Sequence, residues 1–182
     1  MNNKSLKEIS EIRFCLVPKE SLEKKCKVLT PLNLLENNII QEITFDDKVK
    51  IDETTKISNG DIIIKRIMPS FVNYIDNIDE DVYATGNLII IKAISVDAKY
   101  LACILNKSIR RLTQSLSGAT VPAVGRSDLE ALQVPIISEE KQKAIGEIWY
   151  KSLEIYKLKT RLNDLEFLRT TTQINDLINE GK

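Results

Sequence analysis

The chain has 182 residues, 43% of them hydrophobic, and its 26 basic residues are balanced by 26 acidic ones. This length suits one globular domain with an appendage, and the apolar content is sufficient for a buried core. With 6 Gly and 5 Pro, the composition excludes a largely disordered chain, and the longest apolar runs are far too short to span a bilayer.

The first residues, Met1 to Lys4, lead into a charged stretch and not into the apolar core of a signal peptide. We therefore expect a cytoplasmic protein with no membrane partner.

Catalytic and metal chemistry is restricted by what the chain lacks. It has no histidine, and its three cysteines, Cys15, Cys26 and Cys103, share no metal-type spacing. The absence of histidine excludes Ser-His and Cys-His catalysis and every His-containing metal site. We interpret the cysteines as buried reduced thiols, and we expect no metal and no cofactor.

The first third of the chain predicts short elements. Apolar residues within 6–12 favour a short helix or a turn. Residues 27–29, before Thr30 and Pro31, indicate a short strand that ends at the proline. Residues 33–38 are rich in turn formers, and residues 49–51 form a weak alternating strand.

Two buried strands are predicted in the middle of the chain. The turn signal at residues 59–61 is followed by the β-branched run 62–64, which predicts a strand buried on both faces. A second turn at residues 85–87 precedes the run 88–91, which predicts another such strand. Residues 82–84 fit an edge strand.

Asp97 is positioned to cap a helix whose apolar face includes Tyr100, Leu101 and Leu105. We expect that helix to end at residues 117–120, where Gly118 is a suitable stop. A short turn or helix at 126–129 and a last short strand at 132–135 follow. The predicted fold class is therefore a mixed α/β (α+β) globular domain over residues 1–137.

The last segment, residues 138–182, predicts one long helix. Ser138 is a suitable N-cap, and from Glu139 to about Asn179 there is no proline and Gly146 is the one glycine. Apolar residues recur at three-four spacing. A helix of this length, roughly 60 Å at ~1.5 Å per residue, cannot bury its apolar stripe on a domain this small. We expect it to pack against a helix of a partner or of a second copy. The alternative is a helix folded back along its own domain.

Taken together, several segments resemble one half of the specificity subunit of type I restriction-modification enzymes. The order and spacing of these segments carry the resemblance: residues 60–64 (GDIII), 100–106 (YLACILN), 117–122 (SGATVP), Leu129 with 134–136 (VPI), and 139–145 (EEKQKAI). In that family the globular part is a target recognition domain and the helix is a spacer. The usual subunit has two such domains and two spacer helices packed antiparallel, and it recognises a bipartite DNA site.

The chain departs from that pattern, since it has one domain and one helix. The resemblance implies a half-subunit that binds double-stranded DNA and directs a DNA methyltransferase subunit, possibly with a restriction subunit. We expect the missing half to be a second copy, paired helix to helix in an antiparallel coiled coil, with a symmetric target site. A fragment of a longer protein remains the alternative.

No catalytic motif supports an enzyme. The chain has no Pro-Pro pair of the kind found in the Asn-Pro-Pro-aromatic site of DNA methyltransferases, and it has no phosphate-binding Gly-x-x-x-x-Gly-Lys-Ser/Thr loop. Glu139-x-Lys141 matches part of a nuclease motif, but it lies at a helix start where acidic residues suit the dipole. We therefore expect a non-catalytic subunit.

The candidate DNA contacts follow from charge distribution. Residues 98–127 contain no Asp or Glu but several Lys and Arg, so a neutral chain can still present one positive face. Basic and amide side chains contact phosphates and bases. The candidates are Lys65, Arg66, Ser70, Asn73, Tyr74, Lys107, Arg110, Arg111, Gln114, Ser117, Gly118, Thr120 and Arg126. Of these, we expect Ser70, Asn73 and Tyr74 in the loop between the two buried strands. Three groups have an alternative interpretation: Lys65 and Arg66 as a solvent-exposed pair, Arg110 and Arg111 with Gln114 as charge compensation at a helix end, and residues 117–120 as a plain helix stop.

The candidate interface residues lie on the long helix. Aromatic residues are enriched at protein interfaces, and the apolar residues form the three-four stripe. The set is Ile148, Trp149, Ile155, Tyr156, Leu158, Leu162 and Leu165. For Trp149 and Tyr156 the alternative is contact with the chain's own domain. Two other functions remain open: a dimeric coiled-coil adaptor that binds protein instead of DNA, which the neutral charge favours, and a hydrolase of unrecognised type.

Overall fold

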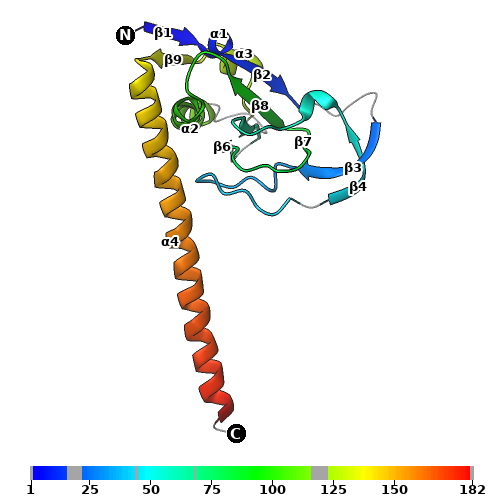
Figure 1. Cartoon of the computed structure of the whole chain (residues 1–182), viewed down its shortest axis with the longest axis vertical. Helices are drawn as coiled ribbons and strands as arrows, with labels where there is room; N and C mark the ends of the chain where they lie inside the picture. The colour runs from blue at the N-terminus through cyan, green and yellow to red at the C-terminus, as the bar shows by residue number, and fades with distance from the viewer. Residues whose placement is uncertain (1, 16–21, 44, 68, 116–122, 181–182) are drawn as a thin grey trace.

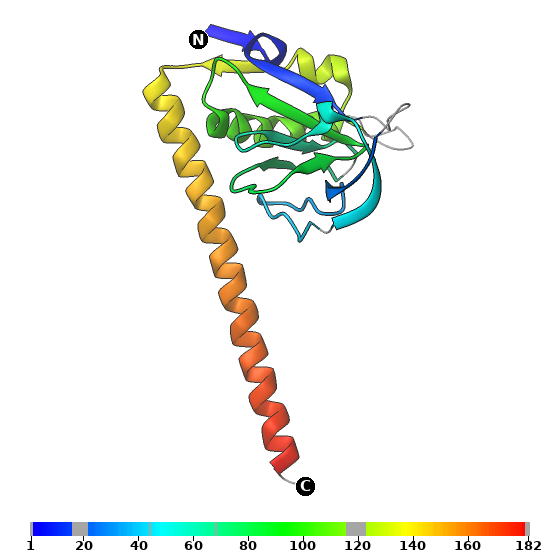
Figure 2. The same ribbon diagram turned by 45° about the vertical axis from the view of Figure 1, so that its right-hand side comes forward.

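The computed structural model describes residues 2–15, 22–43, 45–67, 69–115 and 123–180. A globular α+β domain contains everything up to the last strand, and one long helix starts beside that domain and extends well past it (Figure 1). The turned view in Figure 2 shows the same arrangement, with the far end of the helix clear of the domain. The predicted fold class, a mixed domain followed by a long C-terminal helix, is confirmed.

The elements follow in this order along the chain. They are β1 (Asn2–Ser5), α1 (Leu6–Ile9), β2 (Ser10–Phe14), β3 (Leu22–Leu29), β4 (Phe45–Ile51), the short 3-10 helix η1 (Glu53–Thr55), β5 (Ile62–Lys65), β6 (Val72–Tyr74), β7 (Val82–Ala84), β8 (Leu88–Ala93), α2 (Ala98–Ser115), α3 (Arg126–Glu130), β9 (Gln133–Ile136) and α4 (Glu139–Glu180).

The centre of the domain is a four-stranded antiparallel sheet in the order β2-β8-β5-β6. Its two middle strands are the two isoleucine-rich runs, and alternate residues of each run enter different cores. Ile62 and Ile64 face the core shared with α2, while Ile63 faces the opposite core. Because both faces are covered, these strands are continuously apolar instead of alternating. The prediction of two strands buried on both faces is confirmed.

Helix α2 covers one face of this sheet. The carboxylate of Asp97 accepts a hydrogen bond from the Tyr100 backbone N–H (2.8 Å), which caps the helix as predicted. Tyr100, Leu101 and Leu105 are buried against the sheet. The helix therefore holds its own C-terminal end in a defined position relative to the ends of the strands.

A three-stranded sheet in the order β4-β3-β7 packs over the opposite face. Strand β7 lies at its edge, as expected for residues 82–84, and it pairs in parallel with β3. Strands β3 and β4 are longer than the short runs predicted from the sequence. The short helix predicted within residues 6–12 is present over Leu6–Ile9, but the rest of that segment belongs to strand β2, which pairs with β8.

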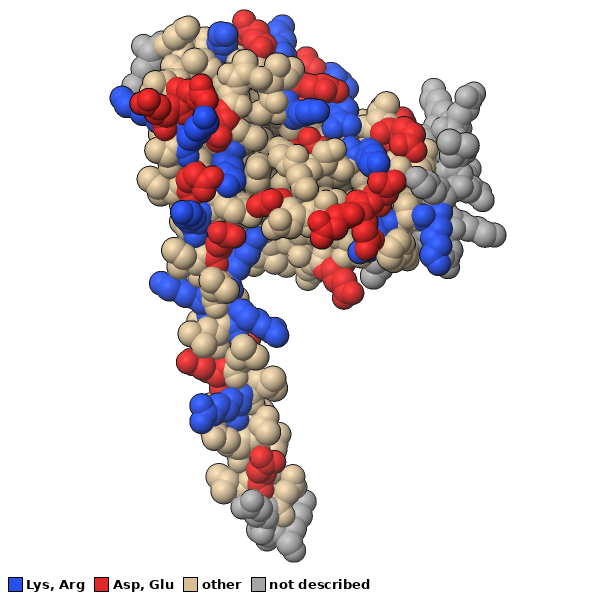
Figure 3. All heavy atoms as spheres, viewed as in Figure 1, with Lys and Arg blue, Asp and Glu red and all other residues tan. Residues whose placement is uncertain are grey.

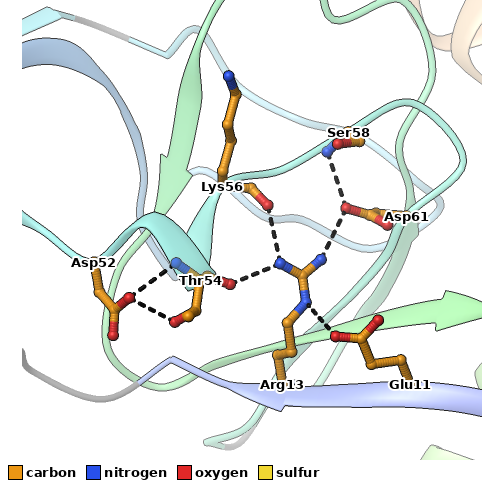
Figure 4. Close-up of polar contacts among 7 residues, drawn as sticks. All are labelled: Glu11, Arg13, Asp52, Thr54, Lys56, Ser58 and Asp61. Atoms are coloured by element: carbon orange, nitrogen blue, oxygen red, sulfur yellow. Dashed lines mark hydrogen bonds and ion pairs between the residues drawn. The ribbon is translucent and has the colours of Figure 1, made fainter.

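Arg13 of β2 is held by the segment 54–61, which connects β4 to β5 (Figure 4). Its Nη1 donates to the carbonyls of Thr54 (2.6 Å) and Lys56 (3.3 Å), and its Nη2 lies 3.5 Å from Oδ2 of the buried Asp61. Burial is the main cause that raises the pKa of Asp61; the Ser58 backbone hydrogen bond and Arg13 oppose it. This arginine has a structural role and is engaged inside the domain.

Two broader features complete the fold. None of the described helices is long and apolar enough to cross a membrane. Within the described ranges, no group of three or more Cys, Asp or Glu residues is arranged to hold a metal ion. The three cysteines are buried and are not joined in disulfides, as predicted.

Candidate nucleic-acid interface

Four chain segments meet where the central strands end. Strand β5 ends at Lys65, opposite Leu88 at the start of β8. The Arg66 backbone N–H donates to the Asn87 carbonyl (3.0 Å), and the Arg66 carbonyl accepts from the Val124 N–H (3.0 Å). We call this region the recognition edge: the end of β2, residues 65–67 and 69–71, the turn 85–87 and residues 123–126.

Backbone contacts keep the recognition edge in place while some charges stay at the surface. Arg66 Nε donates to the Val124 carbonyl (3.1 Å), so this side chain is partly engaged by its own chain. Lys65 Nζ lies 5.3 Å from the centre of the Phe71 ring, and Ser70 Oγ donates to the Arg66 carbonyl (3.2 Å). Lys65, Arg66 and Ser70 lie close together, and part of their hydrogen-bonding capacity is used within the chain.

Arg126 stands at the first position of α3 on the same edge. Its guanidinium lies 4.2 Å from the centre of the Phe14 ring at the end of β2, and it makes a 3.2 Å ion pair with Glu130. The side chain remains exposed. An exposed ion pair of this kind is weak, so the arginine can exchange Glu130 for a phosphate at little cost.

The C-terminal half of α2 leads toward this edge. Lys107 and Arg111 are exposed on that helix. Arg110 and Gln114 also belong to α2, within its last turns. Residues 116–122, which include Ser117, Gly118 and Thr120, lie outside the described residues. The next described residue, Ala123, bridges to Ile67, which places it at the recognition edge.

Two candidates lie elsewhere. The prediction that Asn73 and Tyr74 occupy a loop is wrong, since both belong to β6. Asn73 is fully buried, and its amide donates to the carbonyls of Leu35 (3.2 Å) and Ile39 (3.4 Å). Tyr74 pairs with Ile62 at the end of β5 opposite to Lys65, and its ring contacts α4. These two side chains support the chain's own fold instead of the recognition edge.

Charge on the molecular surface is mixed. Figure 3 shows basic and acidic side chains interspersed over the face in view, without a broad basic area on that face. An open cleft of about 550 Å³ beside β3 and β4 is lined by Glu42, Asp79 and Glu80, and its Lys27 is paired with Glu80 (2.9 Å). Acidic walls repel phosphate, so this cleft is unsuited to a nucleic-acid backbone.

The start of α4 is attached to the domain by close contacts. Gln142 is buried; its Oε1 accepts from the Asp97 backbone N–H (2.9 Å) and its Nε2 donates to the Ile137 carbonyl (2.8 Å). One turn later, Gly146 lies against the first turn of α2. A Cβ on Gly146 would stand 2.7 Å from both the Tyr100 nitrogen and Asp97 Oδ1, so this glycine permits the close approach of two helices.

A polar and aromatic cluster extends this attachment along α4. Tyr150 donates to Asp76 Oδ2 (3.0 Å) and meets the Tyr74 ring edge-on at 5.5 Å. Lys99 of α2 bonds Glu147 (2.6 Å) and lies 4.5 Å from the centre of the Tyr150 ring. The Glu147 hydrogen bond is the main cause that raises the pKa of Lys99, while burial chiefly raises that of Tyr150. The direction of α4 relative to the domain is thereby set.

Beyond these turns α4 leaves the domain with its apolar side chains uncovered. Among the predicted interface residues, the exposed ones are Ile148, Ile155, Tyr156, Leu158, Leu162 and Leu165. Trp149 differs, because it is half-buried and packs against the domain core. For Trp149 the alternative stated from the sequence, contact with its own domain, is what the structure has.

The sequence reasoning missed the residues that attach α4. Gln142, Gly146 and Tyr150 were not singled out, although each makes a specific contact across the junction. The available signal was Gly146, an isolated glycine inside a strongly helical segment, which often marks a close packing contact. Periodicity alone does not indicate which neighbour lies there.

Comparison with protein families gave a match over most of the chain. The family model described as "Type I restriction modification DNA specificity domain" matches residues 1–166. A comparison with curated proteins gave no match.

Solved structures with a similar fold come from the same kind of system. One similar structure is described as the structural basis underlying complex assembly and conformational transition of the type I R-M system. A chain of that structure aligns with a TM-score of 0.61 at 16% identity, and the alignment covers 92% of this chain and 43% of that one. The type I S subunit from M. genitalium aligns with a TM-score of 0.57 at 18% identity, covering 93% and 44%. The HsdS subunit from Thermoanaerobacter tengcongensis aligns at 0.57 and 15%, covering 85% and 37%. The present chain therefore spans less than half the length of each of these solved chains.

Proposed function

The chain belongs to the family of type I restriction-modification DNA specificity domains, and we propose that it recognises one half of a bipartite DNA site without performing any catalytic step itself. The observation that carries the proposal is the pairing of two features in one chain. One is an edge where basic side chains gather, and the other is a long helix held at a set angle to the domain.

The recognition edge supplies the kinds of group that DNA binding requires. Arg66 and Arg126 are basic, Arg111 of α2 adds a third positive charge, and Ser70 and nearby backbone groups are hydrogen-bond donors. Contacts to phosphate position a protein on the duplex, and side chains in a groove distinguish the bases. Because the chain has no net charge, we expect weak binding by the chain alone and tighter binding within an assembly that provides further phosphate contacts.

The partners in this proposal are double-stranded DNA, a DNA methyltransferase subunit and a second copy of the chain. A restriction subunit would join the same assembly in cells that cleave unmodified DNA. The exposed stripe of α4 is the surface proposed for pairing two copies, which would hold two recognition domains a fixed distance apart. The assembly would act in the cytoplasm, where its DNA target lies.

The experiment that tests this function is methylome sequencing of cells with and without the gene. We expect one modified bipartite motif, with symmetric halves, to disappear when the gene is deleted. An unchanged set of modified motifs would contradict the proposal. An asymmetric motif would contradict pairing of two identical copies while leaving DNA recognition intact.

A second assay measures the partner directly. A tagged chain should retain a DNA methyltransferase subunit in a pull-down, and the complex should bind DNA that carries the motif more tightly than scrambled DNA. Tight binding to an unrelated protein, with no DNA binding even when the methyltransferase is present, would instead indicate the protein-binding adaptor, which family membership does not favour.

A further inference from the structure

The turn 85–87 joins β7 to β8 on the recognition edge, and backbone hydrogen bonds fix both of its ends. The Thr85 N–H donates to the Leu29 carbonyl at the end of β3 (3.0 Å), and the Asn87 carbonyl accepts from the Arg66 N–H (3.0 Å). A turn that is attached at both ends presents its side chains in a defined position, so little conformational entropy is lost when a ligand binds there.

Asn87 carries an exposed side chain at the end of this turn. Its backbone is left-handed, with φ of 67°, a conformation that asparagine adopts more readily than most residues. Glycine adopts the same conformation without steric cost. The backbone therefore explains why few residue types fit this position, but it does not require an amide side chain.

The Asn87 amide differs from the two hydroxyl side chains of the recognition edge. Ser70 Oγ donates to the Arg66 carbonyl (3.2 Å), and Thr85 Oγ1 donates to the Leu29 carbonyl (3.3 Å), so both hydroxyls are used within the chain. The Asn87 amide makes no hydrogen bond to another described residue. Its donor and its acceptor are both available to a ligand on this edge.

A side-chain amide has a specific complement among the DNA bases. In the major groove adenine presents the N7 acceptor beside the N6 amino donor, and the amide of asparagine can bond both at once. Guanine presents two acceptors there, which suit arginine or lysine, and a phosphate presents acceptors alone. The minor-groove edge of an A·T pair also has acceptors alone. An available amide is therefore used most fully on the major-groove edge of an adenine.

The neighbours of Asn87 suit an approach to the duplex. Lys65 and Arg66 stand at the end of the adjacent strand and are half-buried, so they can contact phosphates, which position a protein without distinguishing the bases. Gly86, before Asn87, has no side chain to keep the duplex away from the turn.

We propose that Asn87 is a specificity-determining residue that recognises an adenine from the major groove, in the half of the bipartite site that this chain binds. The Nδ2 group donates to adenine N7, and Oδ1 accepts from the N6 amino group. This inference rests on the proposed function and assigns one of its base contacts.

A binding assay with modified DNA tests the contact in the full-length chain assembled with its methyltransferase subunit. Each adenine of the motif is replaced in turn by 7-deazaadenine, which lacks the N7 acceptor. At one position the wild-type complex should lose affinity by roughly 5-fold, and the Asn87→Gly complex should lose nothing further there. Asn87→Gly should bind the unmodified motif about 5- to 150-fold more weakly than wild type.

Two further measurements separate base recognition from a structural effect. Asn87→Gly should bind scrambled DNA as wild type does, with the same salt dependence, because the amide contacts no phosphate. The matched control is Asn77→Gly, since Asn77 is also exposed and left-handed (φ 57°) but lines the acidic cleft. This control should bind the motif as wild type does.

Three results would overturn the inference. They are equal affinity of Asn87→Gly and wild type for the motif, a 7-deazaadenine effect that persists in Asn87→Gly at every position, and a parallel loss of scrambled-DNA binding. In each case a wild-type complex that still prefers its motif over scrambled DNA leaves the proposed function intact. A wild-type complex without that preference would contradict the proposed function and this inference together.

Discussion

Gly146 of α4 lies so close to Tyr100 of α2 that a Cβ added to the glycine would stand 2.7 Å from the tyrosine backbone nitrogen. Real Cβ atoms do not approach backbone this closely, so any larger residue must push the two helices apart. The junction between the domain and α4 therefore depends on the absence of a side chain at one position.

Replacing Gly146 with alanine should lower the free energy of unfolding by about 2 kcal/mol, since overpacking costs more than the roughly 1 kcal/mol that alanine gains in helix propensity. Urea denaturation followed by circular dichroism measures this change. Ser152→Ala, at an exposed position of the same helix, should stay within about 0.5 kcal/mol of wild type. A stabilised Gly146→Ala variant would show that the helices are not in close contact.

Gln142→Leu should destabilise the protein by about 1–3 kcal/mol, because the Asp97 N–H and the Ile137 carbonyl would lose their partner inside the junction. Lys141→Leu, one residue away and exposed, is the matched control and should have little effect. Equal effects of the two substitutions on the urea midpoint would mean that the Gln142 amide contributes nothing specific.

Arg111→Ala should reduce the dependence of DNA affinity on salt. If Arg111 contacts a phosphate, the slope of log K against log salt should flatten by about 0.9, and the double variant with Arg110→Ala by about twice that amount. The measurement is a salt titration of motif DNA binding by the assembled complex, with Lys143→Ala at the start of α4 as the control. An unchanged slope would place these arginines away from the DNA.

Stability should fall at alkaline pH through Cys15. Burial raises the pKa of this thiol to about 12, from 9.0 when it is unperturbed. The folded state keeps the thiol proton to a higher pH than the unfolded state does. The contribution of Cys15 to the free energy of unfolding is therefore complete below pH 9 and is lost as the pH rises toward 12. The loss is up to about 4 kcal/mol.

Other groups also titrate in this range, so the measurement is the difference between wild type and Cys15→Ala in thermal melts from pH 8 to 11. The variant should show the shallower decline. Parallel declines would mean that Cys15 is deprotonated as easily in the folded chain as in the unfolded one.

The distance between two recognition domains should follow the length of α4. Repeating residues 158–164 once would lengthen the helix by about 10.5 Å while nearly preserving the orientation of its faces. In an antiparallel pair this moves the two domains apart by the same amount. The spacer of unspecified base pairs between the two halves of the motif should therefore grow by about 3 base pairs at ~3.4 Å each. Thr160→Ala, which leaves the length unchanged, should leave the gap unchanged.

Much of the fold was predictable because its signals are local. The two isoleucine-rich runs, the Asp97 cap and the long periodic segment each depend on residues close together in the chain, and each forms the element expected. The structure brings Lys65, Arg66 and Arg126 of the candidate interface together. These residues follow turns that the sequence also predicts.

The wrong predictions concern contacts between distant segments. Asn73 and Tyr74 were expected in a loop because β6 is three residues long and lacks an alternating pattern. It is a strand because β5 pairs with it. Asn73 is buried because the loop carrying Leu35 and Ile39 accepts its amide hydrogens, and no local pattern reports such a partner.

The sequence alone determined that α4 is a long helix with more apolar surface than its own domain can cover, since 3.6-residue periodicity and the absence of proline are properties of the chain itself. The tertiary structure decided which face of that helix packs against the domain and which face stays exposed. Gly146, Trp149 and Tyr150 turn toward the domain, and Ile155, Leu158 and Leu162 remain outside. The physical reason is that a helix can bury any of its apolar stripes, and the choice depends on the shape and charge of α2 and β6, which come together only when the whole domain has folded.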